Sequence, residues 1–108
     1  MYRIFYVSTA SPKVTKEVFE EIVSNAAETN KKLGLSGALA FNGFNFAQVL
    51  EGEEAQVKKV YDSIRADERH DGVIMISEKP VSERMYPEWG MIKYDSYLFD
   101  DLIKSMAF

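Results

Sequence analysis

The sequence contains no cysteine, and histidine occurs once in 108 residues. Disulfide bonds, thiolate nucleophiles and cysteine-ligated metal sites are therefore excluded, and one histidine cannot form a metal site by itself. We accordingly expect no bound metal. The absence of disulfides also fits a cytoplasmic protein, since structural disulfides belong to oxidising compartments.

Long apolar runs and clusters of basic residues are absent as well. No apolar run approaches the roughly 18 residues that would span a membrane, so we expect no membrane segment. The chain begins with strand-like residues at Met1-Tyr2-Arg3, so we also expect no signal peptide. The formal net charge is −4, and the absence of a basic run argues against nucleic-acid binding.

The usual sequence signs of an enzyme are missing too. His70, the lone histidine, has no partner serine framed by the glycines of a nucleophile elbow. A single histidine in this setting is more often a capping or loop residue. The stretch Gly34-Leu35-Ser36-Gly37 is too short for a glycine-rich phosphate loop. We therefore do not expect this domain to be an enzyme.

The composition is that of one globular domain. Hydrophobic residues make up 46% and charged residues 28% of the chain, which is ordinary for a packed domain. No linker, internal repeat or low-complexity tract divides the chain. We therefore expect a single domain over residues 1–108.

Hydrophobic periodicity predicts the elements of this domain. Thr15 is a suitable N-cap for a first helix ending near Asn30 or Lys32. Asn42-Gly43 and Asp71-Gly72 are typical of turns. The predicted strands cover residues 2–8, 36–41, 44–50, 73–77 and 89–94, with a second helix around residues 57–64 and a terminal helix from about residue 97.

The order of these elements is β-α-β-β-α-β with an extra C-terminal strand. It predicts an α+β, ferredoxin-like fold in which both helices cover one face of a mixed sheet. Such a fold hosts many functions, so the function has to be argued from individual residues.

Gln48 is a polar residue on a predicted apolar face. Alternate strand residues share a face, so Gln48 points the same way as Phe44, Phe46 and Leu50. A buried primary amide must satisfy two donors and an acceptor. A half-exposed strand position, or a bond to a neighbouring loop, would also explain this residue.

Three more polar side chains lie on such faces. Tyr6 shares a strand face with Ile4, Asn30 extends the core face of the first helix, and Asp67 continues that of the second. Taken singly, Tyr6 could be a core aromatic, Asn30 a helix cap and Asp67 a helix end. Together with Gln48 they would line a space between the helices and the sheet. A planar ligand with carbonyl and ring-nitrogen groups would satisfy them.

With these residues in place, the sequence resembles the BLUF family, blue-light sensors that use flavin. The resemblance runs from Tyr2 to about Tyr94, and the order and spacing of its segments are more specific than any one segment. The matching segments are Tyr2-Arg3-Ile4-Phe5-Tyr6-Val7-Ser8, Asn30 with Gly34-Leu35-Ser36-Gly37, Phe46-Ala47-Gln48-Val49-Leu50-Glu51-Gly52, Asp67-Glu68-Arg69-His70 and Trp89-Gly90-Met91.

The resemblance implies a flavin ring held between the two helices. Tyr6 and Gln48 match the photoactive pair, and Asn30 matches the asparagine that bonds the C4 carbonyl and N3 edge of the ring. FAD is the expected cofactor, while FMN and riboflavin stay open because the ring contacts are shared. The other implied positions are cofactor-binding Thr29, Ile22, Phe46, Ile64, Asp67 and His70, and signalling Trp89 and Met91.

Two positions depart from the family pattern. Ser63 stands where many members carry a basic residue, and Arg65, about 200° further round the helix, does not share its face. Thr29 stands where members often carry histidine or asparagine. We expect both departures to weaken flavin binding while leaving the photoactive pair in place.

The resemblance implies a blue-light photoreceptor in which light-driven transfer of an electron and a proton from Tyr6 switches a hydrogen bond of Gln48. The signal would pass to an effector domain or partner such as a nucleotide cyclase. The apolar face of the terminal helix is expected to form a homodimer contact or to lead into that effector. Two alternatives stay open: a small ferredoxin-like enzyme of the acylphosphatase type, and a flavin-free interaction module.

Overall fold

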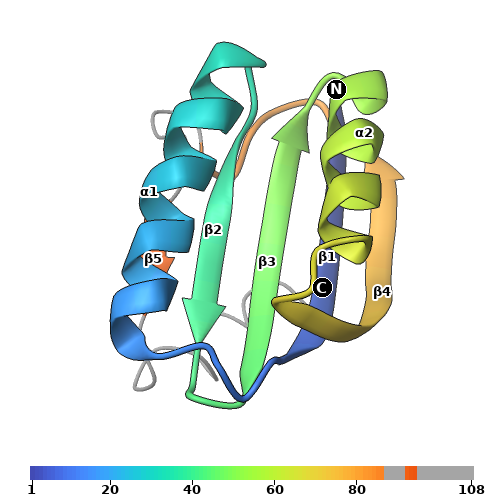
Figure 1. The fold of residues 1–108 in the computed structure, drawn as a ribbon. Coiled ribbons are helices and arrows are strands. Elements are labelled where there is room, and N and C mark those ends of the chain that lie inside the picture. The colour runs from blue at the N-terminus through green and yellow to red at the C-terminus, as the bar shows by residue number, and fades with distance from the viewer. Residues whose placement is uncertain (87–91, 95–108) are drawn as a thin grey trace.

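The computed structural model of the protein describes residues 1–86 and 92–94. The predicted order of strands and helices is confirmed over these residues (Figure 1). The elements are β1 (Tyr2–Ala10), α1 (Lys16–Lys32), β2 (Ser36–Phe41), β3 (Asn45–Gly52), α2 (Glu54–Arg65), β4 (His70–Pro80) and β5 (Ile92–Tyr94). Trp89, Met91 and the predicted terminal helix lie outside the described residues.

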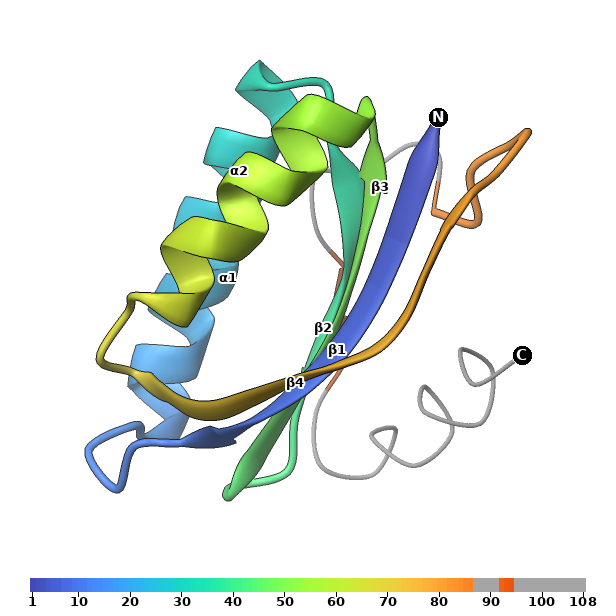
Figure 2. The ribbon, with the colours of Figure 1, turned by 90° about the vertical axis from the view of Figure 1, so that its right-hand side faces the viewer.

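The strands form one mixed sheet, as predicted. Their order across the sheet is β4-β1-β3-β2-β5. β1 is antiparallel to both β3 and β4, β2 and β3 form an antiparallel hairpin, and β5 runs parallel to β2. Both helices cover the same face of the sheet (Figure 2), which confirms the α+β, ferredoxin-like fold.

The first helix begins and ends where the sequence predicts. The Thr15 hydroxyl accepts a hydrogen bond from the amide of Val18, and so satisfies one of the free amides of the first turn. The helix ends at Lys32, and Gly34 follows with a φ of 72°, a conformation that glycine adopts without strain. Neither described helix is both long and apolar enough to cross a membrane.

The hairpin between β2 and β3 turns one residue later than predicted. The side chain of Asn42 accepts hydrogen bonds from the amides of Phe44 and Asn45, and Gly43 takes a φ of 97°. Because the Asn42 amide donates to the Asn45 carbonyl at 3.3 Å and Phe41 pairs with Phe46, the central pair of the turn is Gly43 and Phe44 rather than Asn42 and Gly43. The prediction that Phe44 shares the buried face of the strand is therefore wrong, and its side chain is 75% exposed.

Strand β4 is longer than predicted, and Asp71-Gly72 lies inside it rather than in a turn before it. Val7 pairs with Ile74 but Thr9 pairs with Asp71, so β4 carries one extra residue opposite this part of β1. Gly72 takes a φ of 55° at this bulge. A glycine with positive φ suits a bulge as well as a turn, so the local sequence does not distinguish the two.

The central strands β2 and β3 are buried on both faces, whereas the edge strand β4 is largely exposed. The side facing the helices holds a large apolar cluster that includes Ile4, Phe19 and Leu50. The opposite side holds a smaller one built on Phe5 and Val49. Since strand residues alternate between faces, Tyr6 and Gln48 lie toward the helices, as predicted, whereas odd-numbered residues of β3 point away from them.

Candidate functional site

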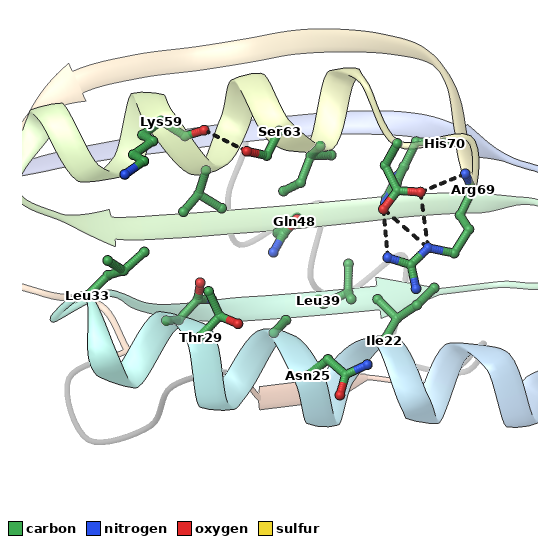
Figure 3. A pocket seen from close by; sticks show the side chains of 15 residues that line it. Ile22, Asn25, Thr29, Leu33, Leu39, Gln48, Lys59, Ser63, Arg69 and His70 are labelled. Atoms are coloured by element: carbon green, nitrogen blue, oxygen red, sulfur yellow. Dashed lines mark hydrogen bonds and ion pairs between the residues drawn. The ribbon is translucent and has the colours of Figure 1, made fainter.

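A cavity of about 460 Å³ lies between the two helices and the sheet. Its walls come from α1, α2, β2, β3, the turn that follows α2 and the first residue of β4, and the Gln48 amide projects into it from β3 (Figure 3). The predicted site residues that line it are Ile22, Thr29, Asn30, Gln48, Ile64, Asp67 and His70. The volume is in the range of ordinary ligand pockets, roughly 300–1,000 Å³.

Tyr6 stands beside Gln48 in the sheet. The two residues face each other directly in the antiparallel pairing of β1 with β3, although only Gln48 lines the cavity. Tyr6 is fully buried, and its hydroxyl has no hydrogen-bond partner among the described residues. Leaving a buried hydroxyl unpaired costs about 1–3 kcal/mol. Burial, with a smaller contribution from Tyr61, raises the pKa of this hydroxyl well above its ordinary value.

Phe46 is the other predicted contact that does not line the cavity. It is fully buried in the helix-side cluster, where its ring centroid lies 5.0 Å from that of Phe41 and 4.4 Å from that of His70. Because His70 lines the cavity and Phe46 does not, Phe46 contacts the site indirectly, by packing against the His70 ring.

Asn30 lies in the last turns of α1 and is only 1% exposed. The C-cap of the helix is Leu33, so the alternative that Asn30 caps its own helix is wrong. Its carbonyl accepts hydrogen bonds from the amides of Leu33 and Leu35, and these bonds turn the chain into β2. The side chain thus lies on the inward face of the helix, as its spacing predicts, and lines the cavity.

Asp67 lines the cavity and is paired with Arg69, which lies at one end of it (Figure 3). The guanidinium donates to both carboxylate oxygens, at 2.6 Å from Nη2 and 3.0 Å from Nε, and the Arg69 amide donates as well. These bonds lower the pKa of the Asp67 carboxyl, against the opposing effect of burial. The structure therefore presents an ion pair at this position, and Arg69 was not predicted as the partner of Asp67.

His70 begins β4, so the interpretation that it is a loop or capping residue is wrong. Its Nδ1 lies 2.8 Å from the Oγ of Ser8, and its ring contacts Phe46. Burial lowers the pKa of His70, while Asp67 raises it and Arg69 lowers it further. The ring is therefore held neutral at the junction of the cavity and the core.

This lowered pKa predicts an acid-dependent loss of stability. The unfolded chain takes up a proton on histidine near pH 6.5 and the folded chain only at lower pH, so His70 stabilises the fold fully above about pH 6.5 and loses this effect as the pH falls through the folded pKa. The urea midpoint of the wild type should therefore fall more between pH 7.5 and 5.5 than that of His70→Gln. Asp67 does not interfere, because its contribution is lost only below about pH 4. If the urea midpoints of the two proteins depend equally on pH, the pKa of His70 is not lowered in the folded protein.

Three polar lining residues were not predicted: Asn25, Lys59 and Arg69. Helical spacing could have found the first two, since Asn25 precedes Thr29 by one turn and Lys59 precedes Ser63 by one turn. Lys59 matters because it places a positive charge on the wall that Ser63 leaves uncharged. The Ser63 hydroxyl donates instead to the Lys59 carbonyl, at 3.2 Å.

The sequence and fold of this chain match those of known proteins. The family described as sensors of blue-light using FAD, BLUF, matches residues 1–92. The chain belongs to the BLUF family. It is therefore a photosensory module that uses flavin, rather than an enzyme in itself.

Two relatives of this BLUF domain are much larger proteins. It is 36% identical over 89 residues to the blue light- and temperature-regulated antirepressor BluF of Escherichia coli, a match covering 81% of this chain and 22% of that protein. It is 34% identical over 107 residues to photoactivated adenylate cyclase subunit alpha of Euglena gracilis, covering 97% of this chain and 10% of that one. The chain thus spans about a tenth to a fifth of these two relatives.

A solved BLUF structure supports the same fold. The BLUF domain of BlrP1, a Klebsiella pneumoniae protein, superposes with a TM-score of 0.83 at 29% identity, covering 98% of this chain and 75% of that one.

The lining residues fit a flavin. Ile22, Leu39 and Ile64 would offer apolar walls to a flat ring, and Asn30 and Gln48 would offer amides to its polar edge. Tyr6, whose hydroxyl has no hydrogen-bond partner among the described residues, is paired with Gln48 in the sheet. The cavity therefore combines an apolar body with few convergent polar groups, which is typical of cofactor sites.

Proposed function

We propose that this BLUF domain detects blue light through a switch of hydrogen bonds at Gln48, driven by Tyr6. The observation that carries the proposal is the direct pairing of the two residues across β1 and β3, with a buried Tyr6 hydroxyl that has no hydrogen-bond partner within residues 1–86 and 92–94. A bound flavin would supply the absorption of blue light and the electron acceptor.

Tyr6 would lose an electron first and a proton second. A neutral tyrosine has a pKa of about 10, and its oxidised form is far more acidic, so loss of the electron drives loss of the proton. Gln48 would relay this proton toward the cavity. Electron and proton then return, so Tyr6 is a neutral phenol again and no net electron transfer remains.

The lasting change would be in Gln48. The two ends of a primary amide are similar in shape and opposite in hydrogen bonding. Rotation or tautomerisation of the Gln48 side chain therefore exchanges a donor for an acceptor in the same space. The altered bond pattern toward the cavity is the stored signal.

The remaining predicted residues would hold the ring. We assign the polar edge of the ring to Asn30, its apolar contacts to Ile22, Phe46 and Ile64, and the distal polar end to Asp67 and His70, with Thr29 on the α1 wall. FAD is the proposed cofactor, and FMN or riboflavin would use the same ring contacts. Signal transfer through Trp89 and Met91 remains a proposal, as both lie outside the described residues.

The output is proposed from the relatives. One of them is named an antirepressor and another a photoactivated adenylate cyclase. We propose that this domain, residues 1–108, reports to a fused or partner effector such as a nucleotide cyclase. The predicted apolar helix from about residue 97 would lead into it or join two copies as a homodimer. A cytoplasmic location is part of this proposal.

The decisive experiment is an absorption spectrum of the purified protein before and after blue light. The expected result is a yellow protein whose flavin bands shift slightly to the red and return in the dark. A colourless protein that does not take up added flavin would instead favour the flavin-free interaction module. A yellow protein without any shift would leave a flavoprotein but remove the light switch.

A further inference from the structure

Glu51 is a buried carboxylate on the face of the sheet opposite the cavity. It lies on β3, three residues after Gln48, and its side chain is completely buried. Its oxygens accept hydrogen bonds from the Nε of Arg3 at 2.8 Å, from the amide of Met85 at 2.8 Å and from the amide of Tyr86 at 2.7 Å. Hydrogen bonds to a carboxylate are stronger and more directional than those between neutral groups.

These bonds belong to a larger attachment of residues 83–86 to one end of the sheet. Arg3, Glu51 and Ser36 are neighbours in register on β1, β3 and β2. Besides its bond to Glu51, Arg3 donates from Nη2 to the carbonyl oxygen of Glu83 at 3.3 Å. The segment passes behind the C-terminal end of β3 toward β2 (Figure 1).

Arg84 completes the attachment on the β2 side. Its guanidinium donates to the Oγ of Ser36 at 2.7 Å, to the carbonyl oxygen of Gly34 at 2.6 Å and to that of Glu51 at 3.3 Å. Tyr86 packs into the apolar cluster on the same face. The chain then leads to β5, which pairs with β2.

Burying the Glu51 carboxylate carries a desolvation penalty that an apolar side chain would not have. This penalty is offset only while the hydrogen-bond partners of the carboxylate are in place. Three donors lie within 2.9 Å of the Glu51 carboxylate. A small movement of β3 would therefore stretch these hydrogen bonds, so residues 83–86 would be pulled along with the strand. Gln48 lies roughly 10 Å away along the same strand. A change in its bonding therefore has a short, rigid route to Glu51.

We propose that Glu51 is a positioning residue that couples β3, which carries Gln48, to residues 83–86 and through them to β5. This inference rests on the proposed light switch and adds the connection from that switch to the far face of the sheet. Movement of β3 in the light would be passed on as a shift of the segment that precedes β5.

The test compares the flavin-loaded wild type with Glu51→Gln and Glu53→Gln. An amide at residue 51 keeps the shape but turns one acceptor into a donor that faces other donors. Glu53 is exposed and makes no side-chain capping bond, so its substitution is a matched control. Two readouts are needed: the red shift of the flavin, and hydrogen exchange of Met85, Tyr86 and residues 92–94 in dark and light.

In Glu51→Gln, the red shift should be normal, and the Met85 and Tyr86 amides should exchange about ten- to hundred-fold faster in the dark. The light-induced change at residues 92–94, whose amides Glu51 does not contact, should disappear, whereas Glu53→Gln should keep it. A purely structural role would not remove this change while the red shift persists.

If Glu51→Gln shows a normal red shift and an unchanged light response at residues 92–94, the coupling role of Glu51 is overturned, while the proposed light switch is not. A wild type without a red shift would overturn the proposed switch and the inference with it. If Glu51→Gln does not fold, Arg84→Met loosens the same segment without a buried unpaired charge. It should reduce the light response at residues 92–94, and an undiminished response would overturn the coupling.

Discussion

Blue light should produce no red shift in the Tyr6→Phe variant, which is expected to be folded, yellow and photochemically silent. Phenylalanine keeps the ring that packs against Tyr61, whose centroid is 5.1 Å away, so the core and the flavin pocket should persist. The substitution removes only the hydroxyl. Because that hydroxyl is buried and lacks a partner among the described residues, its loss should not destabilise the protein without flavin.

Gln48→Leu should also show no red shift, as in Tyr6→Phe, but for a different reason. Leucine approximates the volume of glutamine but has no hydrogen bonds to exchange, so the variant should bind flavin and show no red shift. If Gln48 were only a core residue, this change would be neutral or stabilising and any light response would survive.

Tyr2→Phe is the matched control for both variants. Tyr2 lies on the same strand as Tyr6 and also loses a hydroxyl, but that hydroxyl donates to Glu78 at 2.6 Å, away from the cavity. Its red shift should equal that of the wild type. A full red shift in Tyr6→Phe or Gln48→Leu would reject the switch even if the protein is a flavoprotein.

Asn30→Ala should weaken flavin binding by about ten- to hundred-fold, because removing one partner of a buried hydrogen bond costs about 1–3 kcal/mol. Asn30 is almost fully buried on the α1 wall of the cavity. The measurement is the dissociation constant of the flavin by fluorescence titration.

Asn25→Ala separates this effect from a general change in the helix. Asn25 lies on the same helix and lines the same cavity but is exposed, and alanine favours the helix at both positions. We expect at most a few-fold change in affinity for Asn25→Ala. Similar affinities of the two variants would remove Asn30 from the flavin site.

Local patterns were sufficient for the elements and for the faces of the helices. Asn30 lies inward because it follows Ala26 by one turn, and this spacing is set by the geometry of an α-helix alone. The order of the elements then limits the fold to few topologies, because connections are short and the helices must cover an apolar sheet. The family resemblance supplied the expected role of each residue, which no periodicity contains.

Local patterns failed where two conformations suit the same residues. Asn42-Gly43 is typical of a hairpin, yet the turn is centred on Gly43 and Phe44 because the side chain of Asn42 bonds the amides that follow it. Gly72 serves a bulge in β4 because β1 provides a partner strand there. The choice at Gly72 therefore depends on a strand distant in the sequence, whereas the choice at Asn42 depends on local side-chain bonds.

The sequence alone therefore determined the order of helices and strands, and that Tyr6, Asn30 and Gln48 lie on inward faces. Only the tertiary structure placed Tyr6 directly opposite Gln48, paired Asp67 with Arg69 and buried Glu51 against Met85 and Tyr86. The physical reason is that periodicity reports the direction of a side chain relative to its own element. Strand register, by contrast, is set by turns, bulges and packing between elements, and a shift of one residue would turn every side chain of a strand to the other face.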